Sequence, residues 1–199
     1  GSPPAQEVLR ALSVMIARGP VSPPTAVIAS SATTGSIPGP ARVAICVLPF
    51  ANMSGDPEQE YFSDGITEDI ITDLSKVSAL AVISRNSAFV YKGRHVDVPR
   101  VARELNVSHV LEGSVRKAGG RVRITAQLVV ATSNDHVWAE RYDRDLSDIF
   151  ALQDEISQAI VAALKLKLLP GEKKAIEQRG TDNVEAYNLY LMAWQHYVT

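Results

Sequence analysis

The sequence is poor in cysteine: its 199 residues contain only Cys46. A single cysteine excludes an internal disulfide framework and any zinc site built from several cysteines. It leaves the compartment open, because a domain without disulfides can occur in the cytosol or in the periplasm. Cys46 lies in an apolar run without a basic neighbour, so we expect an unreactive thiol in the core.

Long apolar runs and a strong net charge are also missing. No stretch approaches the roughly 18 apolar residues that a membrane-spanning helix needs, so we expect no membrane contact by this chain. The formal net charge is −2, which does not suit a protein that coats nucleic acid. Apolar residues make up 46% and charged residues 21% of the chain, values that rule out wholesale disorder.

Residues 1–42 differ in composition from the rest of the chain. They hold seven of the eleven prolines and no aromatic residue. Such a segment buries too little apolar surface to offset its ordering entropy, which indicates a Pro/Ser/Thr-rich linker. Apolar residues at helical spacing within 5–17 predict one short helix there, either an upstream remnant or an arm that docks on a domain.

A compact domain is predicted over residues 43–169. The apolar run 43–50 favours a strand buried on both faces, followed by a polar turn at 52–57 and a helix. Ser63 or Asp64 is the expected cap of that helix. A second strand is predicted at 80–84 and a second helix from about residue 98 to Asn106. The first helix buries one apolar face, made of Ile66, Ile70, Ile71, Leu74 and Val77.

The second half of this domain reads as a meander. Gly119-Gly120 between 107–117 and 121–132 is a hairpin signal, and alternating apolar residues in the second segment indicate one buried face. A third strand is predicted at 136–143 and a long amphipathic helix at 149–168. The order βαβαβββα predicts an α/β (α+β) fold with a mixed sheet of about five strands and helices packed on it.

Two segments follow this domain. Residues 170–183 are predicted to be a charged linker. Residues 184–199 are helical in pattern and rich in aromatic side chains, so the helix needs a partner, and we expect it to begin a helical repeat.

Five separated blocks of the sequence resemble the TolB-amino-terminal-like domain of bacterial signalling proteins. The blocks are AICVLPF at 44–50, YFSDGITEDI at 61–70, ISRNS at 83–87, LEGSVRK at 111–117 and VWAERYD at 137–143. The resemblance implies an α/β fold and a place between an amino-terminal effector and carboxy-terminal tetratricopeptide repeats. The effector in such proteins is commonly an adenylate or guanylate cyclase or a winged-helix DNA-binding domain.

The resemblance implies a non-catalytic regulatory, sensing and protein-interaction module, since the family has no agreed catalytic residues. We expect a protein partner or the upstream effector domain, and a second copy of the chain as a further partner. A soluble cyclase as effector favours a cytoplasmic location, whereas a preceding transmembrane helix would place the domain in the periplasm. The alternatives are a nucleotide-related enzymatic activity of the chain itself and nucleic-acid binding through the basic hairpin.

Motifs that carry chemistry are missing. There is no G-x-x-x-x-G-K-[ST] and no G-x-G-x-x-G phosphate loop. The four histidines are scattered and have no neighbours at metal-ligand spacing. We therefore expect no cofactor, no metal and no catalytic residue.

A ligand site is predicted at one edge of the sheet. Polar loops follow the first and second strands, and if these strands are parallel, both loops emerge at the same carboxyl edge, where open α/β sheets bind ligands. Backbone N–H groups at the start of the first helix could hold an anion there. The candidate residues for a small anionic or polar ligand are Asn52, Ser54, Asp64, Gly65, Arg85 and Ser87.

Charge is divided into two poles, which suggests a recognition surface. Residues 56–73 contain seven acids and no base, whereas residues 85–123 contain nine bases and three acids. The poles are either solvated faces that pair within the fold or a surface for a partner with matching charges. The candidate partner-binding residues are Arg116, Lys117, Arg121, Arg123, Tyr190 and Trp194.

Overall fold

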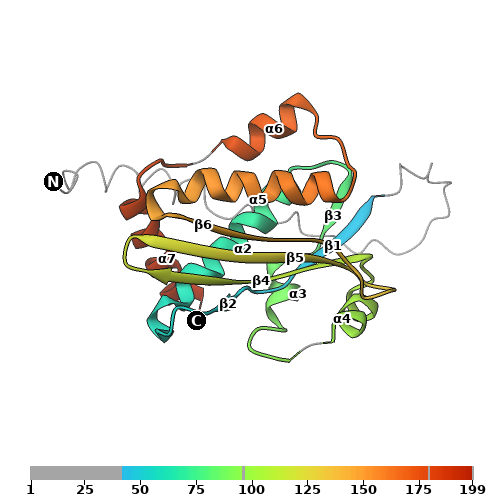
Figure 1. Cartoon of the computed structure of the whole chain (residues 1–199), viewed down its shortest axis with the longest axis horizontal. Helices are drawn as coiled ribbons and strands as arrows, with labels where there is room; N and C mark the ends of the chain where they lie inside the picture. Colours follow the sequence, from blue (N-terminus) through green and yellow to red (C-terminus); the bar gives the residue numbers. More distant parts are fainter. Residues whose placement is uncertain (1–41, 96, 179, 199) are drawn as a thin grey trace, which may run out of the picture.

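The structure of the chain is a computed structural model, which describes residues 42–95, 97–178 and 180–198. The predicted helix at 5–17 and the linker that contains it lie outside the described residues. One mixed sheet organises the domain, with its strands in the order β3-β1-β4-β5-β6 and β2 paired to β4 (Figure 1). The strands are β1 (Val43–Val47), β2 (Ala51–Asn52), β3 (Leu80–Val82), β4 (His109–Ala118), β5 (Arg121–Val130) and β6 (His136–Asp145).

The sheet has a parallel part and an antiparallel part. β1 pairs in parallel with both β3 and β4, whereas β4, β5 and β6 form an antiparallel meander. Gly119 has a φ of 57°, a backbone conformation that glycine adopts without strain at the β4–β5 turn. The predicted mixed sheet and the predicted hairpin are confirmed.

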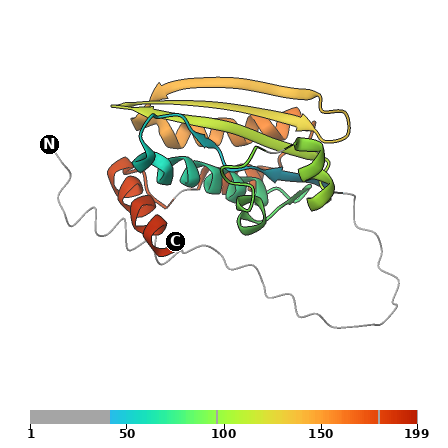
Figure 2. The ribbon, with the colours of Figure 1, turned by 90° about the horizontal axis from the view of Figure 1, so that it is seen from below.

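Helices cover the sheet unequally. α2 (Glu60–Ser75) and α5 (Ile149–Ala163) pack on one face and bury most of the core, including Phe62, Ile66 and Leu128. α3 (Arg85–Phe89) and α4 (Val98–Leu105) cover only part of the other face, over a smaller cluster around Cys46 and Val110. Figure 2 shows the strands side by side, with β6 as the outermost strand of the sheet. The antiparallel strands are therefore open to solvent on one side.

Several predicted boundaries are wrong. The first helix begins at Glu60 after a 3-10 turn at Pro57–Gln59, so Ser63 and Asp64 lie inside the helix and do not cap it. The residues after β3, predicted as a polar loop, form the short helix α3. The run 43–50 is not one strand: β1 ends at Val47, before Leu48 and Pro49, and β2 pairs separately with β4.

The region after α5 also differs from the prediction. A short 3-10 turn (Leu146–Asp148) leads into the long helix, which ends at Ala163 and not at residue 168 as predicted. Residues 170–183, predicted as a linker, contain α6 (Pro170–Glu177), which begins with Pro170 at its first position and buries Ile176 completely. Proline suits a helix start because its missing N–H would have no partner there. α7 (Val184–Val198) follows and packs against α2.

Candidate functional site

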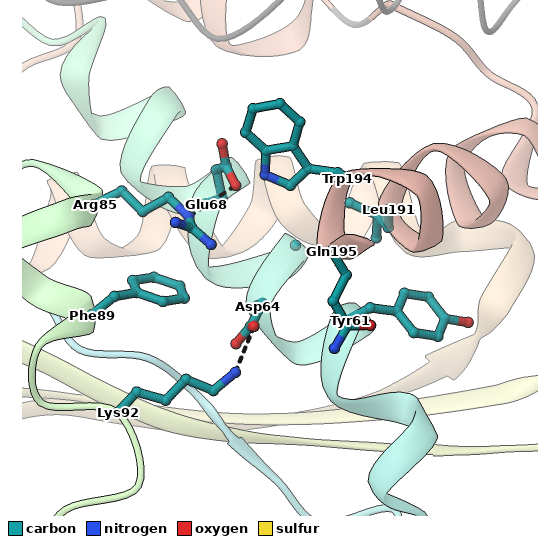
Figure 3. A pocket seen from close by; sticks show the side chains of 10 residues that line it. Tyr61, Asp64, Glu68, Arg85, Phe89, Lys92, Leu191, Trp194 and Gln195 are labelled. Atoms are coloured by element: carbon teal, nitrogen blue, oxygen red, sulfur yellow. Dashed lines mark hydrogen bonds and ion pairs between the residues drawn. The ribbon is translucent and has the colours of Figure 1, made fainter. Parts of the chain in front are cut away.

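A pocket of about 230 Å³ lies where α2, the α3 region and α7 meet (Figure 3). α2 forms its floor, because residues spaced by three or four positions along a helix share one face. α7 forms one wall and the α3 region forms the other, so the pocket exists only while α7 is docked. Its lining residues are Tyr61, Asp64, Gly65, Glu68, Arg85, Phe89, Lys92, Leu191, Trp194 and Gln195.

Two ion-pair groups join the acidic helix to the α3 region. Lys92 Nζ lies 2.6 Å from Asp64 Oδ2 and 3.1 Å from Glu60 Oε1. Arg85 Nε lies 3.2 Å from Glu68 Oε2, and the Arg85 guanidinium sits 4.1 Å from the centre of the Phe89 ring. The acidic pole and part of the basic pole therefore pair within the fold, which is one of the two outcomes that the sequence left open.

Burial controls the protonation of the pocket carboxylates. Loss of solvent raises the pKa of Asp64, and the hydrogen bond and charge of Lys92 oppose this only in part. Burial likewise raises the pKa of Glu68 against the opposing effects of Arg85 and Trp194. Asp64 Oδ1 is buried and has no hydrogen-bond partner among the described residues. The pocket thus presents a buried acceptor in a partly desolvated setting.

The docking of α7 depends on a close approach at Gly65. A Cβ atom at this position would lie 2.5 Å from the methyl groups of Leu191, so a glycine is needed for the observed contact. We call the contact between α7 and α2 around Leu191 and Gly65 the seam. Deeper along it, Gln153 Nε2 donates to Asp69 Oδ2 at 2.6 Å and to the Tyr187 hydroxyl oxygen at 3.0 Å. The Tyr187 hydroxyl in turn donates to Asp69. Tyr187 and Gln153 are almost completely buried, so this network ties α7 to both α2 and α5.

Three of the six predicted ligand residues come together in this pocket: Asp64, Gly65 and Arg85. β1 and β3 are parallel, as the prediction required. The loop after β1, however, bends toward β4, where Ser54 Oγ accepts from the backbone N–H of Lys117.

The other three predicted ligand residues do not line the pocket. Asn52 holds its own turn, with its side chain bonded to the backbone of Ser54 and of Asp56. Ser87 is exposed on α3, and its hydroxyl lies 3.2 Å from that of Ser84. These side chains serve local turn and helix geometry.

The predicted partner-binding residues of the hairpin fall on two faces. Arg116, Arg121 and Arg123 lie on the open face of the sheet, where Arg121 and Arg123 bind Asp143 at 2.5 and 2.6 Å. Lys117 points to the opposite face, 4.7 Å from the centre of the Phe62 ring, and burial lowers its pKa. Since two of the arginines already hold a carboxylate, phosphate binding by the hairpin would have to displace it.

The two aromatic candidates on α7 do lie together. Tyr190 and Trp194 stack with ring centres 6.4 Å apart and an angle of 15° between the planes. Trp194 also lines the pocket beside Glu68 and Arg85 (Figure 3). Both side chains are half-buried against the domain, so part of the surface predicted for a partner is used to dock α7.

Sequence reasoning missed six of the pocket residues: Tyr61, Glu68, Phe89, Lys92, Leu191 and Gln195. One signal could have found the basic side: Glu60, Asp64 and Glu68 recur every four residues, which places three acids on one helix face and calls for a nearby cation. No local pattern points to Leu191 or Gln195, because their role depends on how α7 docks.

The described side chains offer little for covalent or metal chemistry. Burial raises the pKa of Cys46 to about 12, so its thiol stays protonated at neutral pH. Within residues 42–95, 97–178 and 180–198 no group of three or more His, Cys, Asp or Glu side chains is placed to hold a metal ion. In the same part of the chain, no helix has both the length and the apolar character that crossing a bilayer demands.

Comparison with known proteins gives one family and several similar structures. A family described as "HilA/YgeH-like transcriptional regulator, second domain" matches residues 41–159. A curated protein of Rhizobium meliloti (strain 1021), named "Putative adenylate cyclase 3", is 60% identical over 156 residues, which are 78% of this chain and 27% of that protein. The chain therefore spans only about a quarter of the length of this relative.

The similar solved structures share little sequence with the chain. TolB from Acinetobacter baumannii is 18% identical with a TM-score of 0.48, over 63% of this chain and 29% of TolB. Lipoprotein GNA1162 from Neisseria meningitidis is 18% identical with a TM-score of 0.45, over 64% of this chain and 99% of that protein.

Proposed function

The chain belongs to the family of HilA/YgeH-like second domains, and from this premise we propose that it is a non-catalytic regulatory module of a bacterial signalling protein. The observation that carries the proposal is the docking of α7 over the charged pocket. A helix held by one buried network, one glycine contact and one pocket wall can be released as a unit. Such a helix is the kind of two-state element that a regulatory domain requires.

The signalling context rests on the rhizobial relative. This protein bears the name of an adenylate cyclase, so the chain is related to part of a cyclase-related signalling protein, as the sequence predicted at that level. The finer parts of the expectation, an upstream effector and tetratricopeptide repeats that follow α7, belong to this proposal. In it, α7 transmits the state of the domain to whatever segment the parent protein joins to it.

The pocket is the proposed sensing site of this module. It sits between α7 and the domain, so a small polar molecule bound there would touch Asp64 and Arg85 on one side and Trp194 on the other. Because such a ligand gains contacts only when α7 is docked, it would favour the docked state by its difference in affinity for the two states. The unpartnered Asp64 Oδ1 favours a ligand that carries a hydrogen-bond donor.

The absence of catalysis is tested on the 199-residue chain. Incubation with ATP or GTP and Mg²⁺ is expected to give neither cyclic nucleotide nor phosphate above the level of buffer. Turnover that persists through several purification steps and disappears in Asp64→Asn would contradict the non-catalytic reading and favour the nucleotide-related alternative.

Regulation is tested in the full-length rhizobial relative, at the position aligned with Gly65. Gly65→Leu fills the space that Leu191 occupies and is expected to displace α7, while α2 keeps a good helix-forming residue. Cyclic-nucleotide production should then change in kcat, with the KM for ATP retained. The matched control is Gly171→Ala, where an added Cβ meets nothing within 4 Å. If the unmodified protein, Gly65→Leu and Gly171→Ala have equal kcat values although α7 is displaced in Gly65→Leu, the result would count against the regulatory role.

A further inference from the structure

The free edge of the sheet carries an inference that is independent of the pocket. β6 ends the strand order, and within the described residues its backbone bonds to other elements only on the β5 side. On the outward side, the Asp143 carbonyl accepts a hydrogen bond from Nη1 of the adjacent Arg144 at 3.2 Å. The strand is ten residues long, and its irregularity lies at one end, between Leu128 and Val129 of β5. Proteins usually keep free edges short or interrupt them, because a long regular edge is a template for pairing with another chain (Figure 2).

The outward backbone groups of β6 follow from its pairing with β5. Leu146 N–H donates to Gly120 C=O at 2.7 Å, which continues the ladder in which Tyr142 faces Ile124. Hydrogen-bonded pairs recur every second residue, so the even-numbered residues bond to β5. The odd-numbered residues from Ala139 to Asp145 therefore direct their N–H and C=O groups away from the sheet.

The charges of β6 are complementary to themselves in one register. The sequence around the centre is Glu140-Arg141-Tyr142-Asp143-Arg144. If two copies pair antiparallel about Tyr142, Arg141 faces Asp143 of the partner subunit and Glu140 faces Arg144 of the partner subunit. All four cross-strand pairs have opposite signs, which is favourable for directly opposed residues.

Neighbouring registers lack this property. If the two-fold axis instead passes through Glu140, Arg141, Asp143 or Arg144, the charged residue on the axis faces the same residue of the other copy. Like charges directly opposite one another are destabilising. Among the described residues Arg141 has no ion pair within its own chain, so it is available for this contact. Asp143, by contrast, would share its charge with Arg121 and Arg123, and Arg144 would share its charge with Glu155. Charge thus selects Tyr142 as the centre.

The helix beside this edge also permits close approach. α5 packs along β6, and Arg144 Nη2 lies 3.5 Å from Glu155 Oε2, which identifies the side of α5 that borders the edge (Figure 1). Three small residues lie on that side, Ala151, Ala159 and Ala162, together with the longer Gln158. A two-fold axis through Tyr142 would bring the two α5 helices together antiparallel, and small residues let helix axes come close.

We propose that the free edge of β6 is a dimer interface, in which two copies of this chain join their sheets antiparallel with Tyr142 at the two-fold axis. The proposal does not depend on the pocket or on the docking of α7. Such a dimer forms one continuous sheet from two domains. A conformational change in one copy would therefore occur beside β6 of the other copy.

Sedimentation equilibrium of the 199-residue chain over a wide concentration range tests the association. The chain is expected to dimerise, and Arg141→Pro is expected to abolish the dimer, because proline removes an outward donor and no bond to β5. Arg141→Ala is the matched control and should weaken association less. A monomer at every concentration, or a dimer of unchanged strength in Arg141→Pro, would overturn the proposal.

Charge reversal tests the same interface without proline. Glu140→Arg replaces two attractions by two repulsions and is expected to weaken the dimer by about tenfold or more. Adding Arg144→Glu restores opposite signs and should restore association. A double variant that associates no better than Glu140→Arg alone would contradict the assigned charge pairing, even if Arg141→Pro were poorly folded.

The register is tested by cross-linking, since the sole native thiol is buried. In the proposed dimer, residue 139 faces residue 145 of the other copy, and hydrogen-bonded pairs have Cα atoms about 5.5 Å apart, within the range of a disulfide. Ala139→Cys with Asp145→Cys is expected to form covalent dimers under mild oxidation. Ala139→Cys alone should not, because its thiols would be about 20 Å apart. Efficient cross-linking of the single variant would contradict this register.

Discussion

Two arginine–carboxylate pairs of this domain behave in opposite ways. Arg85 and Glu68 meet in the pocket with side chains only 21% and 22% exposed, and burial raises the pKa of Glu68. Arg123 and Asp143 meet on the open sheet face with side chains 46% and 36% exposed, and the two arginine hydrogen bonds lower the pKa of Asp143 to about 2. Both carboxylates contact arginine, but the charged form is disfavoured for Glu68 at the seam and favoured for Asp143 on the sheet. The reason is that desolvation dominates only at the seam.

This contrast indicates different roles for the seam and for the open face of the sheet. The seam around the pocket joins α7 to the domain and includes carboxylates that gain little from being charged, which suits an element that changes state. The open face and the β6 edge keep their charges in water, where they select partners more than they stabilise the fold.

The largest effect at the seam is expected from Leu191→Ala. Leu191 is 5% exposed and packs over Gly65, so its truncation should lower the free energy of unfolding by about 3 kcal/mol. Met192→Ala is the matched control on the same helix, since Met192 is 42% exposed and should change stability by less than about 0.5 kcal/mol. Urea unfolding measures both. Equal effects would show that α7 is not docked as described.

A smaller effect is expected from Tyr187→Phe. Removal of the hydroxyl leaves Asp69 and Gln153 short of one buried hydrogen bond, which should cost about 1–2 kcal/mol. The control is Tyr190→Phe, because no hydrogen bond of the Tyr190 hydroxyl occurs in the described part of the chain. Thermal and urea unfolding should separate the two variants. If Tyr187→Phe leaves the free energy of unfolding unchanged, the buried network does not stabilise the docking of α7.

The two carboxylates should give opposite pH dependences. Asp143 has a lowered pKa, so its stabilisation is present above its ordinary pKa of 3.8 and is lost as pH falls toward about 2. Glu68 has a raised pKa, so stability should increase as pH falls through that raised value toward 4.5.

Urea unfolding at a series of pH values checks both signs. Asp143→Asn should flatten the loss of stability below pH 3.8, and Glu68→Gln should flatten the gain in mild acid. If both variants change the profile in the same direction, the contrast between seam and sheet is wrong.

The smallest effect is expected on the open face from Thr125→Ala. Thr125 is exposed on β5, so the free energy of unfolding should change by no more than about 0.5 kcal/mol. The neighbouring Ile124→Ala removes a side chain that is fully buried on the other face and should cost about 2–5 kcal/mol. A large effect of Thr125→Ala would mean that this face is covered in solution, as by a second copy.

Local patterns predicted the fold well where they were long and regular. The alternation of β5 and the spacing of Ile66, Ile70 and Leu74 identified buried faces that the structure has. The failures lie at short elements: α3 has five residues and α6 eight, too few for periodicity alone to distinguish a helix from a loop. α4 is as short as α6, but Pro99 at its start and Asn106 at its stop allowed it to be predicted.

The candidate site could be predicted only in part for a related reason. Asp64 and Gly65 lie on a predicted helix, and Arg85 follows a strand parallel to β1, so topology brings them together. Leu191 and Trp194 reach the pocket from more than 100 residues away in sequence, through a docking contact that depends on the missing side chain of Gly65. No local pattern contains that information.

Native-state hydrogen exchange of α7 tests the central claim most directly. If α7 belongs to the cooperative unit of the domain, the amides in its docked part should be protected nearly as strongly as those of α2, and Leu191→Ala should lower the protection of α7 far more than that of β5. Amides of α7 that exchange as in an isolated helix, while α2 stays fully protected in the unmodified chain, would contradict a regulatory module built on this seam.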